Sequence, residues 1–140
     1  MVQIAEWLGG EKVLHFNVRN DMDLNRIILA GIPVAAVSEV ARRAQLNQSE
    51  VERIVSRRTL GRLKDGMKRL TPELSDRLIR YTRILLLAEE TFESRDNALV
   101  WMRRPNRALG GSIPLEMLET DNGARMVEQV LGRMAHGVFS

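Results

Sequence analysis

The chain has 140 residues, of which 44% are hydrophobic, so it can bury one core and a small second lobe. It contains no cysteine, which excludes disulfide bonds, thiolate metal sites and a cysteine nucleophile. The net charge is only +3, no apolar run reaches the roughly 18 residues of a membrane span, and no signal-peptide pattern is visible, so we expect a cytoplasmic protein with no membrane association.

The first 20 residues predict a short helix and the one strand-like segment of the chain. Residues 1–8 form an amphipathic helix at best, which Gly9 and Gly10 end. Residues 13–19 alternate between apolar and polar side chains, which is typical of a strand. Because a single strand leaves its backbone groups unpaired, our hypothesis is that it pairs with the same strand of a second copy in a two-fold dimer. A surface loop is the alternative.

Two helices are expected next. Asp21 begins a helix that runs through Ala30, with acidic residues in its first turn, and Gly31 ends it. A second helix covers residues 33–44 and ends at two arginines, a charge that suits the C-terminal end of a helix dipole.

The positive charge is concentrated in one fifth of the chain. Residues 42–69 carry nine basic and three acidic side chains, a local charge of +6, whereas the remaining residues sum to −3. A basic surface on a near-neutral remainder indicates an acidic partner, with nucleic acid as the first choice. A solvated helix face produces the same pattern and is the alternative.

Residues 47–66 predict two short helices joined by a tight turn. Asn47 followed by Glu50 is a capping-box pattern that begins the first helix, and Ser56 can cap the second. The apolar positions of the second helix share one face and are Leu60, Leu63 and Met67.

This layout is that of a helix-turn-helix, with basic residues at the start of the second helix. In such a motif the second helix lies in the major groove, where its first turns reach base edges and flanking cations meet phosphates. A helical pair that binds nothing is the alternative. The predicted DNA-binding residues are Arg57, Arg58, Thr59, Arg62 and Lys64.

Thr71 and Pro72 predict the start of the longest helix of the chain. Apolar residues follow at helical spacing as far as Phe92, and further apolar residues between them widen the stripe, so we expect this helix to be buried on two sides. Asp96 can cap the next helix, which leads to Trp101.

Residues 101–120 predict the end of a helix, a tight loop containing Gly110 and Gly111, and a short helix that begins at Pro114. Thr120 is the expected N-cap of a last helix, which ends near Gly137. By spacing alone this region is a helical hairpin that packs for stability. The apolar stripe of the last helix consists of Ala124, Val127, Leu131 and Met134.

The residue types and their spacing give little support for a catalytic function. His15 lies on the expected strand and His136 at a helix end, and no His/Asp/Glu spacing resembles a metal site. The Gly110–Gly111 pair lacks the preceding strand and the Gly-Lys-Ser/Thr ending of a phosphate loop. We therefore expect no enzyme activity and no cofactor.

A dense series of residues between positions 98 and 137 carries a family resemblance: Ala98, Trp101, Pro105, Asn106, Leu109, Gly110, Gly111, Pro114, Leu115, Glu116, Leu118, Thr120, Gly123, Val127, Glu128, Leu131, Arg133 and Gly137. The series resembles the C-terminal domain of the Xre/MbcA/ParS-type antitoxins. The match is looser over residues 46–97 and weak before residue 46.

The resemblance implies a partner toxin, often of the RES type, which acts on NAD or uses it in an ADP-ribosyl-transfer-like fold. It also implies a homodimer that binds operator DNA in its own promoter through a helix-turn-helix. In similar proteins the C-terminal end lies over or inside the toxin's NAD pocket, so neutralisation would be steric. The expected toxin-binding residues are Trp101, Asn106, Arg133, Gly137, Val138, Phe139 and Ser140.

These patterns together predict a mainly α fold with one short N-terminal strand. Residues 1–45 are an N-terminal region with a possible role in dimerisation, residues 46–70 the helix-turn-helix, and residues 71–140 the toxin-binding domain. Two alternatives stay open: a helix-turn-helix transcriptional regulator without a toxin partner, and an adaptor whose basic face contacts RNA or acidic protein groups.

Overall fold

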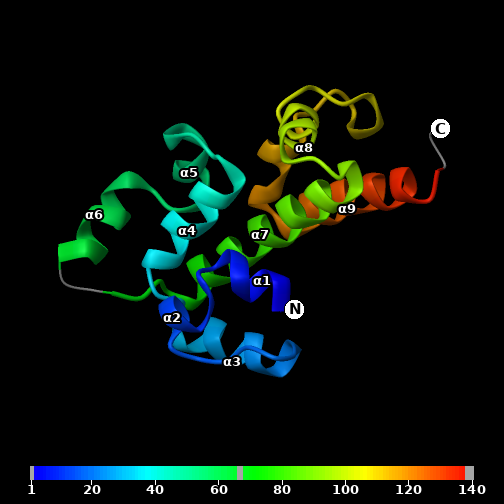
Figure 1. The fold of residues 1–140 in the computed structure, drawn as a ribbon. Helices are drawn as coiled ribbons and strands as arrows, with labels where there is room; N and C mark the ends of the chain where they lie inside the picture. Colours follow the sequence, from blue (N-terminus) through cyan, green and yellow to red (C-terminus); the bar gives the residue numbers. More distant parts are fainter. Residues whose placement is uncertain (1, 66–67, 138–140) are drawn as a thin grey trace. The chain divides into compact units, whose positions relative to one another are not determined.

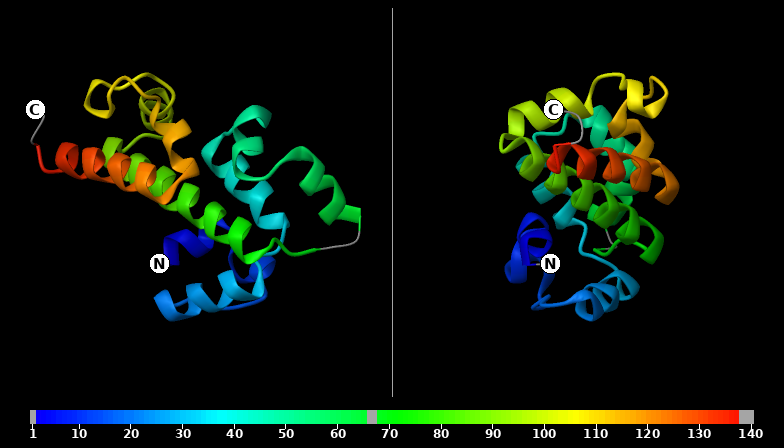
Figure 2. Two further views of the ribbon diagram at one scale, coloured as in Figure 1. Left: turned by 180° about the vertical axis from the view of Figure 1, so that it is seen from behind. Right: turned by 90° about the vertical axis from the view of Figure 1, so that its right-hand side faces the viewer.

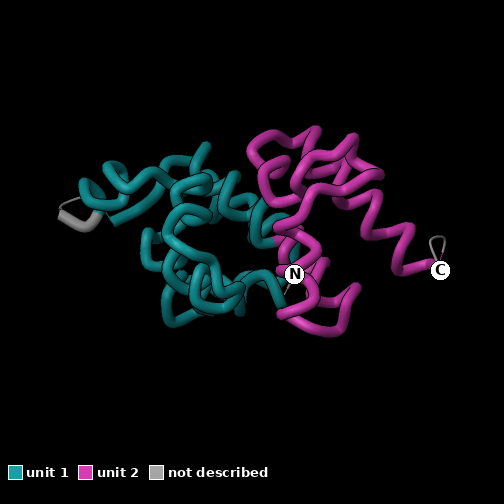
Figure 3. The backbone as a smooth tube through the Cα atoms, turned by 90° about the horizontal axis from the view of Figure 1, so that it is seen from above, with its two compact units in different colours: residues 1–82 teal, residues 83–140 magenta. Residues whose placement is uncertain are grey.

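A computed structural model describes residues 2–65 and 68–137, except for the side chains of Val2, Lys64 and Asp65. The chain divides into two compact units, residues 1–82 and 83–140, and the boundary lies within helix α7 (Pro72–Phe92) (Figure 3). The predicted mainly α class is confirmed, because the elements of the described chain are α-helices and short 3-10 helices (Figure 1). No helix among the described residues has the length and apolarity that a membrane span requires.

Unit 1 is built around helix α4, against which α1 and α2 pack. Its core is formed by apolar side chains from every helix of the unit, among them Trp7, Leu14, Ile27, Val40, Ile54, Leu63 and Leu78. The helices before α7 are α1 (Val2–Trp7), α2 (Gly10–Leu14), α3 (Asp21–Ala30), α4 (Ala35–Ala44), α5 (Gln48–Ile54) and α6 (Arg57–Asp65).

The predicted strand over residues 13–19 is wrong. Helix α2 continues to Leu14, His15 turns the chain in the left-handed region at φ 56°, and residues 17–19 form a loop. Leu14 and Val18 are buried as the alternation predicts, but Phe16 is 38% exposed. A helix end followed by a loop therefore produced the period of two, and the loop alternative holds for residues 15–19 only. Dimerisation through paired strands loses its basis.

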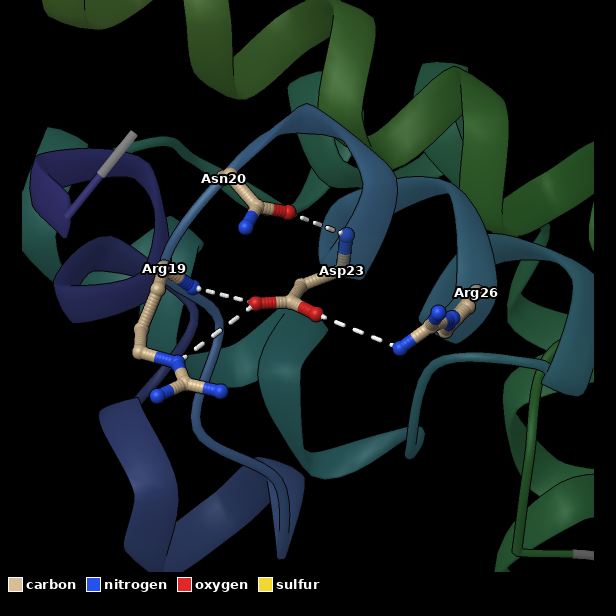
Figure 4. Close-up of polar contacts among 4 residues, drawn as sticks. All are labelled: Arg19, Asn20, Asp23 and Arg26. Atoms are coloured by element: carbon tan, nitrogen blue, oxygen red, sulfur yellow. Dashed lines mark hydrogen bonds and ion pairs between the residues drawn. The ribbon is translucent and has the colours of Figure 1, made fainter.

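The loop is held by the start of α3 instead of by a second strand. Asp23 is buried, and one oxygen of its carboxylate accepts a hydrogen bond from the backbone N–H of Arg19 at 3.0 Å (Figure 4). The other oxygen lies 3.6 Å from a guanidinium nitrogen of Arg26, and the side chain of Asn20 caps the helix at the Asp23 N–H. Local hydrogen bonds thus satisfy the backbone here.

Residues 68–70, which follow α6, lie beside residues 32–34, which precede α4. Backbone hydrogen bonds join the two segments: the N–H of Val34 donates to the carbonyl of Lys68, and the N–H of Leu70 donates to the carbonyl of Ile32. The buried hydroxyl of Ser75 on α7 accepts a hydrogen bond from the Ile32 N–H at 2.8 Å. These hydrogen bonds hold residues 68–70 and the first turn of α7 against the segment before α4.

Unit 2 consists of the second part of α7, α8 (Arg95–Met102), the 3-10 helices η1 (Arg107–Leu109) and η2 (Pro114–Glu119), and α9 (Asp121–Ala135). Helix η2 packs against both α8 and α9, and α9 runs beside the second part of α7 (Figures 1 and 2). The predicted caps at Thr71 and Thr120 are confirmed. Asp96 was predicted to cap α8. The helix begins earlier, at Arg95, so Asp96 lies within its first turn and Ser94 is the N-cap.

Gly123 shows how closely this unit is packed. It lies buried in the first turn of α9, where an added Cβ would collide with the carbonyl oxygen of Met117 in η2. We expect Gly123→Ala to lower the free energy of unfolding by about 1–3 kcal/mol, measured by urea denaturation, since backbone must shift to admit the methyl group.

A control is Gly132→Ala, in the same helix, where an added Cβ meets no described atom within 4 Å. That change should raise stability by up to about 1 kcal/mol through helix propensity. Equal effects of the two substitutions would contradict the packing argument.

Candidate functional sites

Helices α5 and α6 begin where the sequence predicts, because each has a side-chain cap. The Asn47 side chain accepts a hydrogen bond from the Glu50 N–H, and the Glu50 carboxylate accepts one from the Asn47 N–H, both at 2.9 Å, which completes the capping box. The Ser56 hydroxyl oxygen accepts from the Thr59 N–H at 3.1 Å. These caps fix where the first turn of each helix begins.

Three of the predicted DNA-binding residues lie together on the exposed surface of α6. Arg57, Arg58 and Arg62 are exposed, and Thr59 is half-buried at the capped start of the helix. The side chain of Lys64 lies outside the described residues. The structure therefore brings three guanidinium groups to one helix, which a polyanion can contact through charge-assisted hydrogen bonds.

Arg57 also connects α6 to α5. Its Nε lies 3.1 Å from a carboxylate oxygen of Glu52. When the Gln48 amide is oriented with its oxygen toward the guanidinium, that oxygen accepts hydrogen bonds from Nε and Nη2 of Arg57 at 3.0 and 2.7 Å. Sequence reasoning missed Gln48 and Glu52 as members of this surface, because contacts between two helices leave no periodic signal. The outer face of α5 and the start of α6 thus form one polar surface.

A second helix pair in unit 1 also has a helix-turn-helix layout. Helices α4 and α5 are joined by residues 45–47, and Gln45 adopts the left-handed conformation at φ 56°. Helix-turn-helix turns usually have three or four residues, whereas α5 and α6 are joined by residues 55–56 alone. The turn was not recognisable from sequence, since glycine or asparagine usually occupies a left-handed position.

In unit 2 the loop after α8 is organised by Asn106. Its backbone N–H donates to the Ser112 carbonyl at 2.9 Å, its carbonyl accepts from the Gly111 N–H at 2.8 Å, and its side-chain oxygen accepts from the Ala108 N–H. Gly110 and Gly111 take φ angles of 65° and 85°, as the tight loop requires. Asn106 therefore shapes the loop, and Arg107 is exposed on it.

The other predicted toxin-binding residues lie on two different elements. Trp101, half-buried on α8, packs against Phe92 with ring centroids 5.9 Å apart, so part of its surface serves the core of unit 2. Arg133 and Gly137 are exposed at the C-terminal end of α9, where Gly137 has φ 74° and donates to the Met134 carbonyl. Val138, Phe139 and Ser140 lie outside the described residues.

The two histidines lie at the C-terminal ends of two different helices. His136 Nδ1 lies 2.7 Å from the Gly132 carbonyl at the end of α9, and His15 is exposed on a loop. The described residues contain no group of three or more side chains able to hold a metal ion.

Comparisons with known proteins match each unit separately. Residues 23–83 match the family model described as the antitoxin Xre-like helix-turn-helix domain. Residues 87–137 match the antitoxin Xre/MbcA/ParS C-terminal toxin-binding domain.

Three curated relatives, each called antitoxin Xre, resemble the chain over most of its length. The relative from Photorhabdus laumondii is 33% identical over 120 residues, which cover 84% of this chain and 81% of that protein. The relative from Yersinia enterocolitica is 34% identical over 81% of this chain and 78% of that protein. The relative from Pseudomonas putida is 30% identical over 84% of this chain and 74% of that protein.

Proposed function

The chain belongs to the Xre family of antitoxins, and from that premise we propose that it neutralises a cognate RES-type toxin by covering its NAD-binding active site and also binds its own promoter. The observation that supports this division of labour is the match of family models to units: the helix-turn-helix model covers residues 23–83, and the toxin-binding model covers residues 87–137. Such a protein is not an enzyme and works in the cytoplasm.

Neutralisation is proposed to be steric. Arg133 is exposed in the last turn of α9, Gly137 is exposed just after the helix, and the sequence continues with Val138, Phe139 and Ser140. An arginine can pair with an acidic group in the toxin's pocket, while valine and phenylalanine add apolar area. Buried aromatic side chains and desolvated arginines dominate interface energies. Trp101 and Asn106 would contribute a second contact region.

DNA binding is proposed to use the polar surface shared by α5 and α6. Arg58 and Arg62 would contact phosphates or guanine edges, and Arg57 would do so from its position beside Glu52. Thr59 and Lys64 complete the proposed set. Helix-turn-helix proteins read paired half-sites about one helical turn apart, so we propose a homodimer on a palindromic operator.

The test is co-expression with the enzyme encoded by the reading frame next to this one. We expect the two proteins to co-purify and the chain to restore cellular NAD, measured by an enzymatic cycling assay. If the neighbouring product leaves NAD unchanged and binds no part of the chain, the toxin assignment fails. Specific promoter binding in that case would leave a transcriptional regulator without a toxin partner.

A further inference from the structure

Gly61 occupies an unusual place for a glycine. It lies inside α6, four residues after the helix begins at Arg57, and it adopts no left-handed φ. An added Cβ would meet no described atom within 4 Å. Glycine inside a helix destabilises it by roughly 1 kcal/mol relative to alanine. Neither the backbone conformation nor packing within the described chain therefore explains glycine here, in contrast to Gly123.

Gly61 also lies at the centre of the exposed face of α6. At about 100° per residue, it is roughly 160° around the helix from Leu63, which is 3% exposed and faces the core. Arg57, Arg58 and Arg62 are exposed on either side of it. The helix thus presents a patch of bare backbone with Arg58 and Arg62 on one side and Arg57, which is paired with Glu52, on the other.

We propose that Gly61 is the point at which the backbone of α6 comes into van der Waals contact with the DNA duplex. This inference rests on the proposed promoter binding and names the part of α6 that approaches most closely. A side chain at this position would hold the helix away from the duplex. The arginines would then make longer hydrogen bonds, whose strength falls steeply with distance.

DNA is the partner that the surroundings of Gly61 favour. A duplex carries closely spaced phosphates on both sides of a groove, which matches cations on both sides of a bare helix face. The family model for the helix-turn-helix domain also covers the whole of α6. An acidic protein surface is the competing occupant, and the experiment separates the two.

The experiment compares the full chain with Gly61→Ala and Gly61→Leu. Both new residues favour helix, so we expect the thermal midpoint to rise by a few degrees for each. Affinity for a duplex spanning the chain's own promoter should fall by at least about fivefold for alanine, the effect of losing roughly one hydrogen bond, and further for leucine. Gly132→Ala, a helical glycine with equally open surroundings, should raise the midpoint and leave DNA affinity unchanged.

Each other outcome overturns the inference. Unchanged promoter affinity in both Gly61 variants would show that the duplex does not approach this point, while wild-type binding would still support the proposed function. A lowered midpoint would mean that Gly61 serves the fold. Loss of toxin neutralisation with DNA binding intact would assign the α6 face to a protein partner. Absence of promoter binding by the wild-type chain would remove the proposed DNA function and this inference together.

Discussion

Removal of residues 137–140 is expected to abolish protection against the toxin while leaving promoter binding intact. The deletion begins after α9 ends at Ala135, so it spares the buried stripe that holds α9 in unit 2. It removes the apolar side chains of Val138 and Phe139, and a buried aromatic side chain can contribute about 2 kcal/mol or more at the centre of an interface. The occluding segment would be removed without unfolding the protein that carries it.

The measurement is growth and NAD content of cells that express the toxin with the full or shortened chain. A promoter gel-shift on the same preparations reports DNA binding. Phe139→Ala is expected to weaken toxin binding at least about tenfold. Met126→Ala, which truncates an exposed apolar side chain of unit 2 outside the proposed toxin-binding set, is the matched control with little expected effect. Full protection by the shortened chain would show that the active site is closed by another part of unit 2.

The double substitution Arg58→Ala with Arg62→Ala is expected to lower promoter affinity by about a hundredfold. Each arginine is exposed on α6, and a base or phosphate contact is typically worth about 1–3 kcal/mol. The slope of log affinity against log salt concentration should become shallower by about one for each phosphate that the variant no longer neutralises. Toxin neutralisation should persist, because both residues belong to unit 1.

A fluorescence-anisotropy titration at several salt concentrations checks both parts of this prediction. Arg95→Ala with Arg125→Ala removes the same charge from exposed positions of unit 2 and is the matched control, with expected affinity close to wild type. Unchanged binding by the Arg58 and Arg62 variant would indicate that the α4–α5 pair binds the DNA instead. In that pair Gln48 of α5 is exposed.

Patterns confined to a few consecutive residues predicted most of the helices correctly. The capping pattern at Asn47, the cap at Ser56 and the cap at Thr120 are all present in the structure with the expected hydrogen bonds. Such caps join groups two or three residues apart, so local sequence is sufficient to specify them. The predicted apolar stripe of α9 is buried at Ala124, Val127 and Leu131, whereas Met134 is half-buried.

The errors arose where a local pattern had more than one structural solution. Alternation over residues 13–19 suits a strand, yet the buried positions Leu14 and Val18 are equally satisfied by a helix end and a loop. Asp23, four residues beyond the segment, binds the backbone that a strand partner would have bound. No period in the sequence reveals that bond.

The sequence by itself determined the helical class, most of the helix starts and the basic character of α6, because propensity, capping and charge act over neighbouring residues. Tertiary structure decided which side chains share a surface. Arg57 reaches Glu52 and Gln48 only because α5 and α6 lie against each other. Asn106 forms hydrogen bonds within its own loop only because the loop brings Ser112 next to it. These contacts depend on which segments of the chain lie next to each other, and packing of the whole core determines that.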